Sequence, residues 1–153
     1  MKDTEQNLDA TKIAFKLEVE DDWPPFKVEN LWLKKLESGY EVRNIPFFIE
    51  NLAFRDLILI SKSGDDLYEI EKILRRSGNS TLLALIDDES IKDEVLRRVK
   101  KLGCRYETGV LKGYYTINVP PEVDVDDLES TLEEYLTTEQ VLLDYPFVYG
   151  EDS

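Results

Sequence analysis

The stretch TLLALIDDESIKDEVLRRVKKLGCRYETGVLKGYYTINV, residues 81–119, decides the fold of the second half of the chain. Its first six residues form an apolar run of strand length, which predicts a buried strand at 81–86. A helical pattern follows, and Gly103 is expected to end it, because glycine readily adopts the left-handed conformation found at helix C-termini. The remaining residues predict a hairpin of two strands, at 105–111 and 114–119.

Two helices are expected in this half of the chain. Ser90, with Asp93 three residues later, is a variant of the capping box and predicts the start of the first helix. The second helix is expected to open at Asp124 or Asp126. The residues expected to face the core are Ile91, Val95, Val99 and Leu102 in the first helix, and Leu128, Leu132, Tyr135 and Leu136 in the second.

The order of these elements predicts a domain organisation. Strand, helix, strand, strand and helix in succession match a ferredoxin-like βαββα unit over 81–145, followed by an acidic tail at 146–153. Residues 1–11 lack an apolar run and are expected to be disordered. Residues 12–80 are expected to form a small twisted antiparallel sheet or partial barrel docked on the ferredoxin-like unit. The predicted fold class is therefore α+β.

The first half of the chain shows five short strand patterns. The turn at Glu37-Ser38-Gly39 joins two of them into a hairpin. The last pattern is ambiguous, because Ile70, Ile73 and Leu74 also fit helical spacing, but the turn before it and the loop after it favour a strand. The expected strands are 12–20, 31–36, 40–45, 57–61 and 67–75.

Charge is divided unevenly along the chain. Its 153 residues carry 33 acidic and 19 basic side chains, which gives a formal net charge of −14. Residues 113–153 hold 11 of the acids and no Lys or Arg. Phosphate backbones and anionic lipid repel such a protein, so we expect no nucleic-acid partner and no membrane association. The basic cluster Arg97-Arg98-x-Lys100-Lys101 is expected to be a solvated helix end rather than a nucleic-acid patch.

The chain has no histidine and one cysteine. Without histidine it lacks the usual general base and the usual metal ligand, so we expect a non-enzymatic protein with no cofactor and no metal site. An enzyme built on Asp, Glu, Lys or Tyr alone is a third interpretation, but no motif points to one. Cys104 is expected to be a buried small hydrophobe. A single cysteine cannot form an internal disulfide, which is typical of a cytoplasmic protein.

Four short motifs together carry a resemblance to a known family. They are Trp23-Pro24-Pro25, Glu29-x-Leu31-Trp32, Asn44-Ile45-Pro46-Phe47-Phe48 and Arg76-Ser77-Gly78-Asn79-Ser80-Thr81. Over about 12–145, the chain resembles the uncharacterised bacterial family catalogued as domain of unknown function 4265. The resemblance implies a cytosolic bacterial protein and no established reaction.

A glycine loop with hydroxyls, an amide and two arginines is one candidate site. Such a loop can hold an anion through backbone N–H groups and bidentate guanidinium groups, and the protein would then be a ligand-binding regulatory module. The alternative is a tight turn whose side chains bond their own backbone. The spacing is not that of a nucleotide P-loop. The candidate residues are Arg75, Arg76, Ser77, Gly78, Asn79 and Ser80.

The base-free segment is the other candidate site, and it favours a protein partner. A small acidic protein without catalytic apparatus is typical of an immunity protein or antitoxin, which would neutralise a basic toxin domain by direct binding. Exposed tryptophans would add binding energy, unless they plug one end of the first sheet. The sequence sets no oligomeric state. The predicted partner-binding residues are Glu122, Asp124, Asp126, Asp127, Glu129, Glu133, Glu134, Glu139, Trp23 and Trp32.

Overall fold

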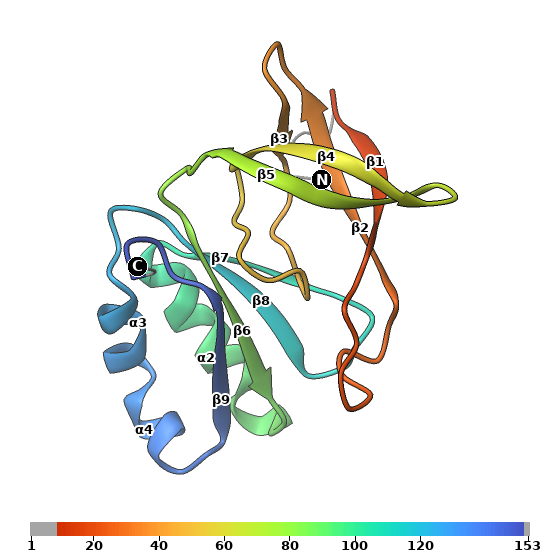
Figure 1. Ribbon diagram of the computed structural model, residues 1–153. Helices are drawn as coiled ribbons and strands as arrows, with labels where there is room; N and C mark the ends of the chain where they lie inside the picture. The colour runs from red at the N-terminus through yellow and green to blue at the C-terminus, as the bar shows by residue number, and fades with distance from the viewer. Residues whose placement is uncertain (1–8, 152–153) are drawn as a thin grey trace. The chain divides into compact units, whose positions relative to one another are not determined.

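Residues 9–151 are described by the computed structural model of this chain, and they belong to two units (Figure 1). The first unit ends at Ser77 and the second starts at Gly78. Within the described residues, the first unit is a five-stranded barrel and the second is a four-stranded sheet with three helices. The predicted α+β class and the barrel-like first half are confirmed. Most of the predicted disordered segment, 1–11, lies outside the described residues, although Thr11 already belongs to the first strand.

The barrel is built by strands that each pair antiparallel with the next one along the chain. The ambiguous pattern at 67–75 is a strand, as predicted, and it pairs with its predecessor along its whole length. The last strand closes onto the first in parallel through Phe15 and Tyr68. The strands are β1 (Thr11–Lys16), β2 (Val28–Lys35), β3 (Tyr40–Val42), β4 (Leu57–Gly64) and β5 (Leu67–Arg75).

The first strand ends at Lys16 and is shorter than the predicted 12–20. A tight turn follows at 20–23. Glu20 and Trp23 exchange two backbone hydrogen bonds, of 2.9 and 3.0 Å. The two residues between them, Asp21 and Asp22, have φ angles of 54° and 65°. Positive φ at both central positions is the geometry of a type I′ turn, which aspartate tolerates better than most residues. The turn therefore fixes the backbone of Trp23, from which its side chain extends.

The barrel has an apolar core, and a fully buried carboxylate, Asp56, lies directly before β4. Asp56 is 0% exposed, and its carboxylate accepts hydrogen bonds from Ala53 N at 2.9 Å and Ser77 N at 2.9 Å. It also forms an ion pair of 2.8 Å with Arg76. The apolar residues of this core are Phe15, Leu31, Leu33, Val42, Leu52 and Ile58. The carboxylate is thus paired and hydrogen-bonded, as burial of a charge requires.

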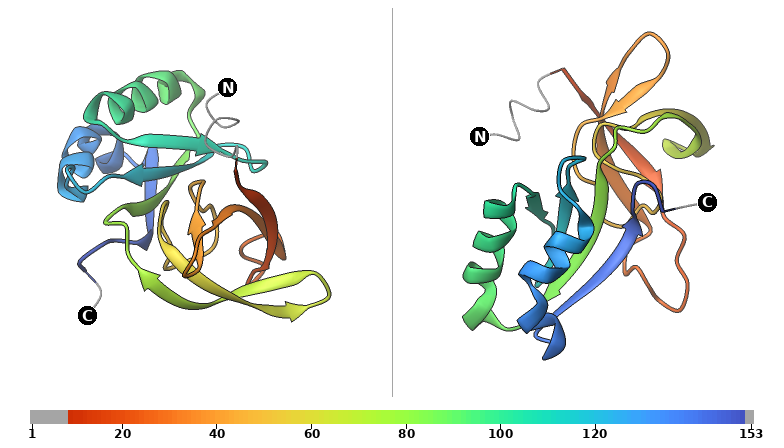
Figure 2. Two further views of the ribbon diagram at one scale, coloured as in Figure 1. Left: turned by 90° about the horizontal axis from the view of Figure 1, so that it is seen from above. Right: turned by 90° about the vertical axis from the view of Figure 1, so that its left-hand side faces the viewer.

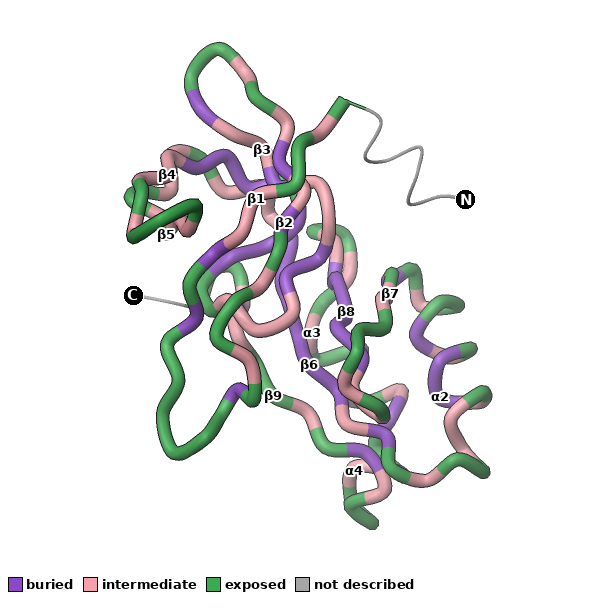
Figure 3. The backbone as a smooth tube through the Cα atoms, turned by 90° about the vertical axis from the view of Figure 1, so that its right-hand side faces the viewer, coloured by how far each residue is buried: buried purple, intermediate pink, exposed green. Residues whose placement is uncertain are grey.

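The second unit is a sheet with helices on one of its faces (Figure 2). Its strand order is β7-β8-β6-β9, and all neighbours are antiparallel. In Figure 3, β6 and β8 are buried along most of their length. The elements are β6 (Ser80–Ile86), α2 (Glu89–Leu102), β7 (Arg105–Thr108), β8 (Tyr114–Val119), α3 (Val125–Thr131), α4 (Glu133–Thr137) and β9 (Val141–Phe147).

Strand β9 is a correction to the sequence analysis. The predicted unit ended at 145 and an acidic tail was expected from 146, but Pro146 and Phe147 are the last residues of this strand. The sequence of β9 lacks a clear alternation of buried and exposed residues, because this strand lies at the edge of the sheet. Leu142 and Tyr145 are 49% and 42% exposed there. Proline is tolerated at an edge, where its missing N–H costs no ladder hydrogen bond.

The helices begin and end at residues that differ in part from the prediction. The N-cap of α2 is Asp88, not Ser90: its carboxylate accepts a hydrogen bond from Ser90 N at 2.9 Å. Gly103 ends this helix as predicted, with φ at 109°. The expected second helix is two short helices that meet at Leu132. No helix within residues 9–151 is both long enough and apolar enough to span a membrane.

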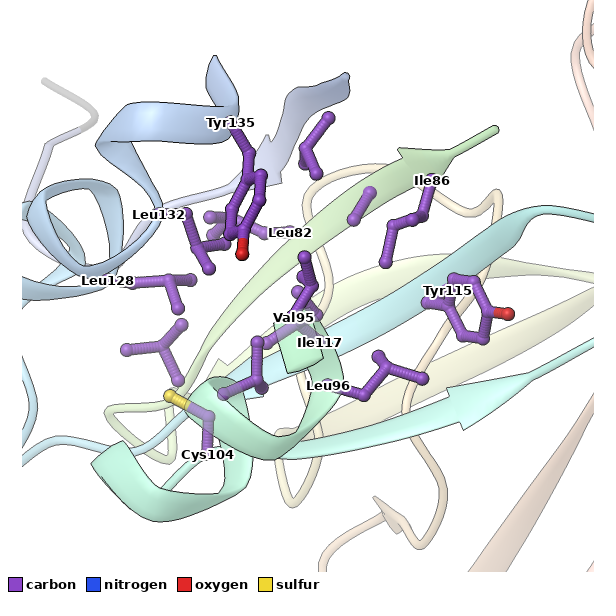
Figure 4. Packing of buried hydrophobic residues seen from close by; sticks show 14 residues of the cluster. Leu82, Ile86, Val95, Leu96, Cys104, Tyr115, Ile117, Leu128, Leu132 and Tyr135 are labelled. Atoms are coloured by element: carbon purple, nitrogen blue, oxygen red, sulfur yellow. The ribbon is translucent and has the colours of Figure 1, made fainter. Parts of the chain in front are cut away.

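The core of the second unit lies between the sheet and the helices (Figure 4). Leu128, Leu132 and Tyr135 point toward it from α3 and α4, as the helical spacing predicted. Cys104 is 3% exposed, which confirms it as a buried small residue. Burial raises the pKa of its thiol to about 11, so the reactive thiolate is disfavoured near neutral pH.

Substitution of the buried carboxylate in the barrel should be strongly destabilising. We predict that Asp56→Ala lowers the free energy of unfolding by about 3–5 kcal/mol, because Arg76 and two backbone N–H groups lose their acceptor. Urea unfolding followed by circular dichroism measures this. Glu71→Ala, at an exposed position of β5, is the control and should change stability by about 0.5 kcal/mol or less. Equal losses in the two variants would contradict the structural role of Asp56.

Candidate functional site

Arg76 and Ser77 of the predicted anion loop bond to other residues of the first unit. Arg76 donates from Nη1 to Asp56 Oδ2 at 2.8 Å and from Nη2 to Asn51 Oδ1 at 3.0 Å. Ser77 N donates to Asp56 Oδ1 at 2.9 Å, and Ser77 Oγ donates to Phe54 O at 2.7 Å. These donors thus hold the end of β5 against the segment that precedes β4. Arg75 is exposed on the last position of β5.

The second half of the loop is bonded within the second unit. Asn79 is buried, and its Oδ1 accepts from Asn118 Nδ2 at 3.2 Å. Ser80 Oγ accepts from Tyr149 N at 2.9 Å. Gly78 has φ at 97°, and a Cβ on it would lie 3.0 Å from Pro121 Cγ, so this position favours glycine. In these bonds, Arg76, Ser77, Asn79 and Ser80 contact groups that are far away in the sequence, rather than their own backbone as in the tight-turn alternative.

The predicted aromatic set forms a cluster around Phe48. Its ring contacts Trp23 edge to face at a centroid distance of 5.7 Å, and Phe47 at 5.1 Å. Phe26, which the sequence analysis left out, contributes at 5.9 Å. Trp32 is half-buried and makes no ring contact with another aromatic residue in the described part of the chain. Trp23 is 41% exposed, so it does not simply plug one end of the barrel.

A groove of about 550 Å³ opens beside this cluster, within the first unit. Its floor is apolar and comprises Phe15, Leu17, Ile49 and Ile70. Its aromatic wall comprises Trp23, Pro24 and Phe48. Its charged rim comprises Glu18, Glu20, Asp21, Glu50 and Glu69, with Lys16 as the one basic residue. The groove thus combines an exposed aromatic face with five carboxylates.

A buried carboxylate holds the aromatic wall in place. Glu29 Oε2 accepts from Phe47 N at 2.6 Å, and Oε1 accepts from Phe48 N at 2.8 Å and Ile49 N at 3.0 Å. Burial raises the pKa of Glu29, and the three backbone N–H groups partly oppose that rise. Asn44 Oδ1 accepts from Trp32 N at 2.8 Å, which ties the residues before this turn to β2. Glu29 therefore shapes the turn that carries Phe48.

The eight acidic residues predicted to bind a partner lie on the helical side of the second unit and its flanking loops. Seven are exposed, and Glu129 is half-buried. Two are engaged within the chain: Glu129 accepts a hydrogen bond from the Tyr145 hydroxyl, and Glu134 pairs with Arg98 at 3.2 Å. The other six form no ion pair with a residue between 9 and 151: Glu122, Asp124, Asp126, Asp127, Glu133 and Glu139.

Part of this acidic surface lines a hollow of about 440 Å³. Asp124, Asp126 and Glu151 meet there with Pro121 and with Tyr149, which is 53% exposed. Tyr149 and Glu151 were not among the predicted site residues, because they lie beyond the last predicted element. Their position follows from β9, which brings the end of the described chain back beside the loop before α3.

The basic cluster on α2 is largely neutralised by its own surroundings. Arg97 and Arg98 both pair with Glu94 at 2.8 Å, and Arg98 also reaches Glu134. Lys100 and Lys101 lie in the last helical turn, where the helix dipole favours positive charge. Between residues 9 and 151, no three Cys, Asp or Glu side chains gather so as to hold a metal ion.

Loss of the Glu29 carboxylate should loosen the aromatic wall. We predict that Glu29→Ala lowers the free energy of unfolding by about 2–4 kcal/mol, because three backbone N–H groups lose their acceptor in a largely buried place. Urea unfolding measures the loss, and near-ultraviolet circular dichroism should report weaker aromatic signals. Glu37→Ala, an exposed turn position, is the control. Unchanged aromatic signals in Glu29→Ala would contradict its role in positioning Phe48.

The raised pKa of Glu29 predicts a pH dependence of stability. The folded chain binds the Glu29 proton more tightly than the unfolded chain does, so this group stabilises the fold most at pH values below its ordinary pKa of 4.5. Its contribution should then fall as pH rises through the folded pKa. The measurement is the difference in unfolding free energy between the unsubstituted protein and Glu29→Gln, from about pH 4 to pH 7. A difference that grows with pH would contradict the direction of the shift.

Comparison with known proteins supports the fold and gives a family. No curated protein matches the chain. A crystal structure of a hypothetical protein from Neisseria gonorrhoeae is similar to this chain, with a TM-score of 0.74 at 20% sequence identity. The similarity covers 90% of this chain and 96% of that one, and at this identity it shows the fold alone. The family model of the domain of unknown function DUF4265 matches residues 29–143, so the chain belongs to this family, as its motifs indicated.

Proposed function

We propose that this is a non-enzymatic binding protein that docks a basic protein partner through acidic surfaces. The observation that carries the proposal is the set of exposed carboxylates without an internal cation. Six of the eight predicted partner-binding acids form no ion pair within residues 9–151. They belong to residues 113–153, which contain no Lys or Arg. Such a surface raises the rate at which a basic partner associates.

The distribution of the bases supports the same proposal. Several arginines are paired with other acids: Arg76 with Asp56, Arg97 with Glu94, and Arg43 and Arg55 with Glu41. Arg98 pairs with one of the predicted partner-binding acids, Glu134. The surface therefore keeps its negative potential. A basic partner accounts for this potential more specifically than a role in solubility does.

The finer role that we propose is that of an immunity protein or antitoxin in the cytoplasm of a bacterium. Such a protein needs no catalytic group; it needs a surface that covers a basic toxin domain. The buried Cys104 and the lack of histidine agree with a binding role rather than a reaction. The alternative role, a regulatory module with an anion site, has less support, because Arg76, Ser77, Asn79 and Ser80 already bond other groups of the protein.

We also propose that the second unit is of the ferredoxin-like class. Its elements follow one another as strand, helix, strand, strand, helical segment and strand. Strand β8 lies between β6 and β7, which α2 connects, and this is the arrangement of a split βαβ unit. The fourth strand, β9, completes a pattern of which the sequence had predicted only five elements.

The proposal is tested with the product of the gene next to this one, co-expressed with the full chain. We expect that product to be basic and toxic when expressed alone, and this protein to restore growth and to bind it. The triple variant Asp124→Asn, Asp126→Asn and Asp127→Asn should slow association by about tenfold at low salt. A rise in salt from about 0.05 M to 0.5 M should slow the unsubstituted protein similarly.

The control removes the same charge elsewhere, by Glu37→Gln, Asp65→Asn and Glu71→Gln, all at exposed positions of the first unit. It should change the association rate by about twofold or less. An equal effect of the two triple variants would show that only net charge matters. A neighbouring gene product that is neither basic nor toxic would contradict the immunity role.

A further inference from the structure

The groove of the first unit lies where the barrel closes. Strands β1 and β5 pair in parallel through a single residue pair, Phe15 and Tyr68. Beyond that pair, residues 16–18 and residues 69–70 both line the groove. Leu17 N donates to Lys27 O at 2.8 Å, which extends the pairing of β1 with β2 past the end of β1. The groove therefore lies beside the place where β1 and β5 close the barrel.

The wall of the groove is held in place before any ligand binds. Trp23 is fixed at its backbone by the tight turn with Glu20 and at its ring by the edge of Phe48. Phe48 is fixed in turn by the Glu29 carboxylate. The indole still remains 41% exposed. An aromatic side chain that is rigid and exposed loses little entropy on binding, and tryptophan is the residue most enriched among binding hot spots.

The rim of the groove has a strong excess of negative charge. Five carboxylates face one ammonium group, that of Lys16. None of these carboxylates forms an ion pair with a residue in the described part of the chain. An anion or a nucleic acid would be repelled here. A purely apolar ligand would cover the carboxylates without pairing them, which costs free energy.

We propose that this groove seats an arginine or lysine side chain from a basic polypeptide. The aliphatic stem of such a side chain matches the apolar floor, and its charged head matches the carboxylate rim. A guanidinium group over the indole of Trp23 adds a cation–π interaction. The inference rests on the proposed function for the basic character of the partner, but it assigns the contact to a different surface, in the barrel. A metal ion is a poorer occupant, since no described cluster of three ligands exists.

The direct test uses the emission of Trp23. Trp32→Phe leaves Trp23 as the only tryptophan of the chain. A short capped peptide with two arginines between glycines is the probe, and the same peptide with citrulline, which keeps the shape and removes the charge, is its control. We expect a saturable change in emission with the arginine peptide below about 1 mM and at least a tenfold weaker response with citrulline. No saturable change, or equal responses to the two peptides, would overturn the proposal.

Matched variants locate the binding site. Glu20→Gln with Glu69→Gln removes two rim charges and should weaken the arginine peptide at least tenfold. Glu37→Gln with Glu71→Gln removes the same charge outside the groove and should weaken it about twofold or less. Equal weakening by both pairs would mean attraction by net charge only and would overturn the proposal. Circular dichroism of each variant shows whether it folds.

Failure of this inference is distinguishable from failure of the proposed function. The triple variant of Asp124, Asp126 and Asp127 leaves the groove intact, so it should bind the arginine peptide as the unsubstituted protein does. If that triple variant alone weakens the peptide, the cation binds to the second unit and the groove proposal is wrong. If the basic partner binds normally to the Glu20 and Glu69 variant, the docking function stands without the groove.

Discussion

The candidate site in the barrel depends on one half-buried carboxylate. Glu29 lies on β2 and accepts three successive backbone N–H groups, those of Phe47, Phe48 and Ile49. A turn with three donors on one side needs a strong acceptor there, because unpaired N–H groups in a buried place are costly. The turn then sets the ring of Phe48 against Trp23. Motif residues that are far apart in the sequence thus serve a single aromatic wall.

The second constraint is how the chain uses its bases. Arg76 compensates a fully buried carboxylate, and Arg98 bridges α2 to the break between α3 and α4, where it donates to Thr131 O at 3.2 Å and lies 5.0 Å from the Tyr135 ring centroid. Arg76 thus stabilises the first unit from within, whereas Arg98 stabilises the second unit and also pairs with the exposed Glu134. The other predicted partner-binding acids keep their negative charge without such a pair within residues 9–151.

Much of the fold was predictable, because burial imposes local periods. The stripe of Leu128, Leu132 and Tyr135 repeats with the helix, and the barrel strands alternate with period two. Strand β9 was not predicted, because an edge strand with a proline and exposed apolar residues lacks that period. The groove could not be predicted from the sequence for another reason. Its residues come from four separate segments, which only the closure of the barrel brings together: 15–18, 20–24, 48–50 and 69–70.

In the roles that we propose, the two acidic surfaces contribute differently to binding. Freely exposed carboxylates such as Asp126 and Asp127 act at a distance, so they raise association rates but hold a bound partner weakly in salt. The groove acts only on contact, since an indole, an apolar floor and a carboxylate rim must meet the same side chain. Contacts of this kind determine dissociation rates and hence residence time. Fast association and slow release therefore call for different kinds of surface, and each unit carries one of the two kinds.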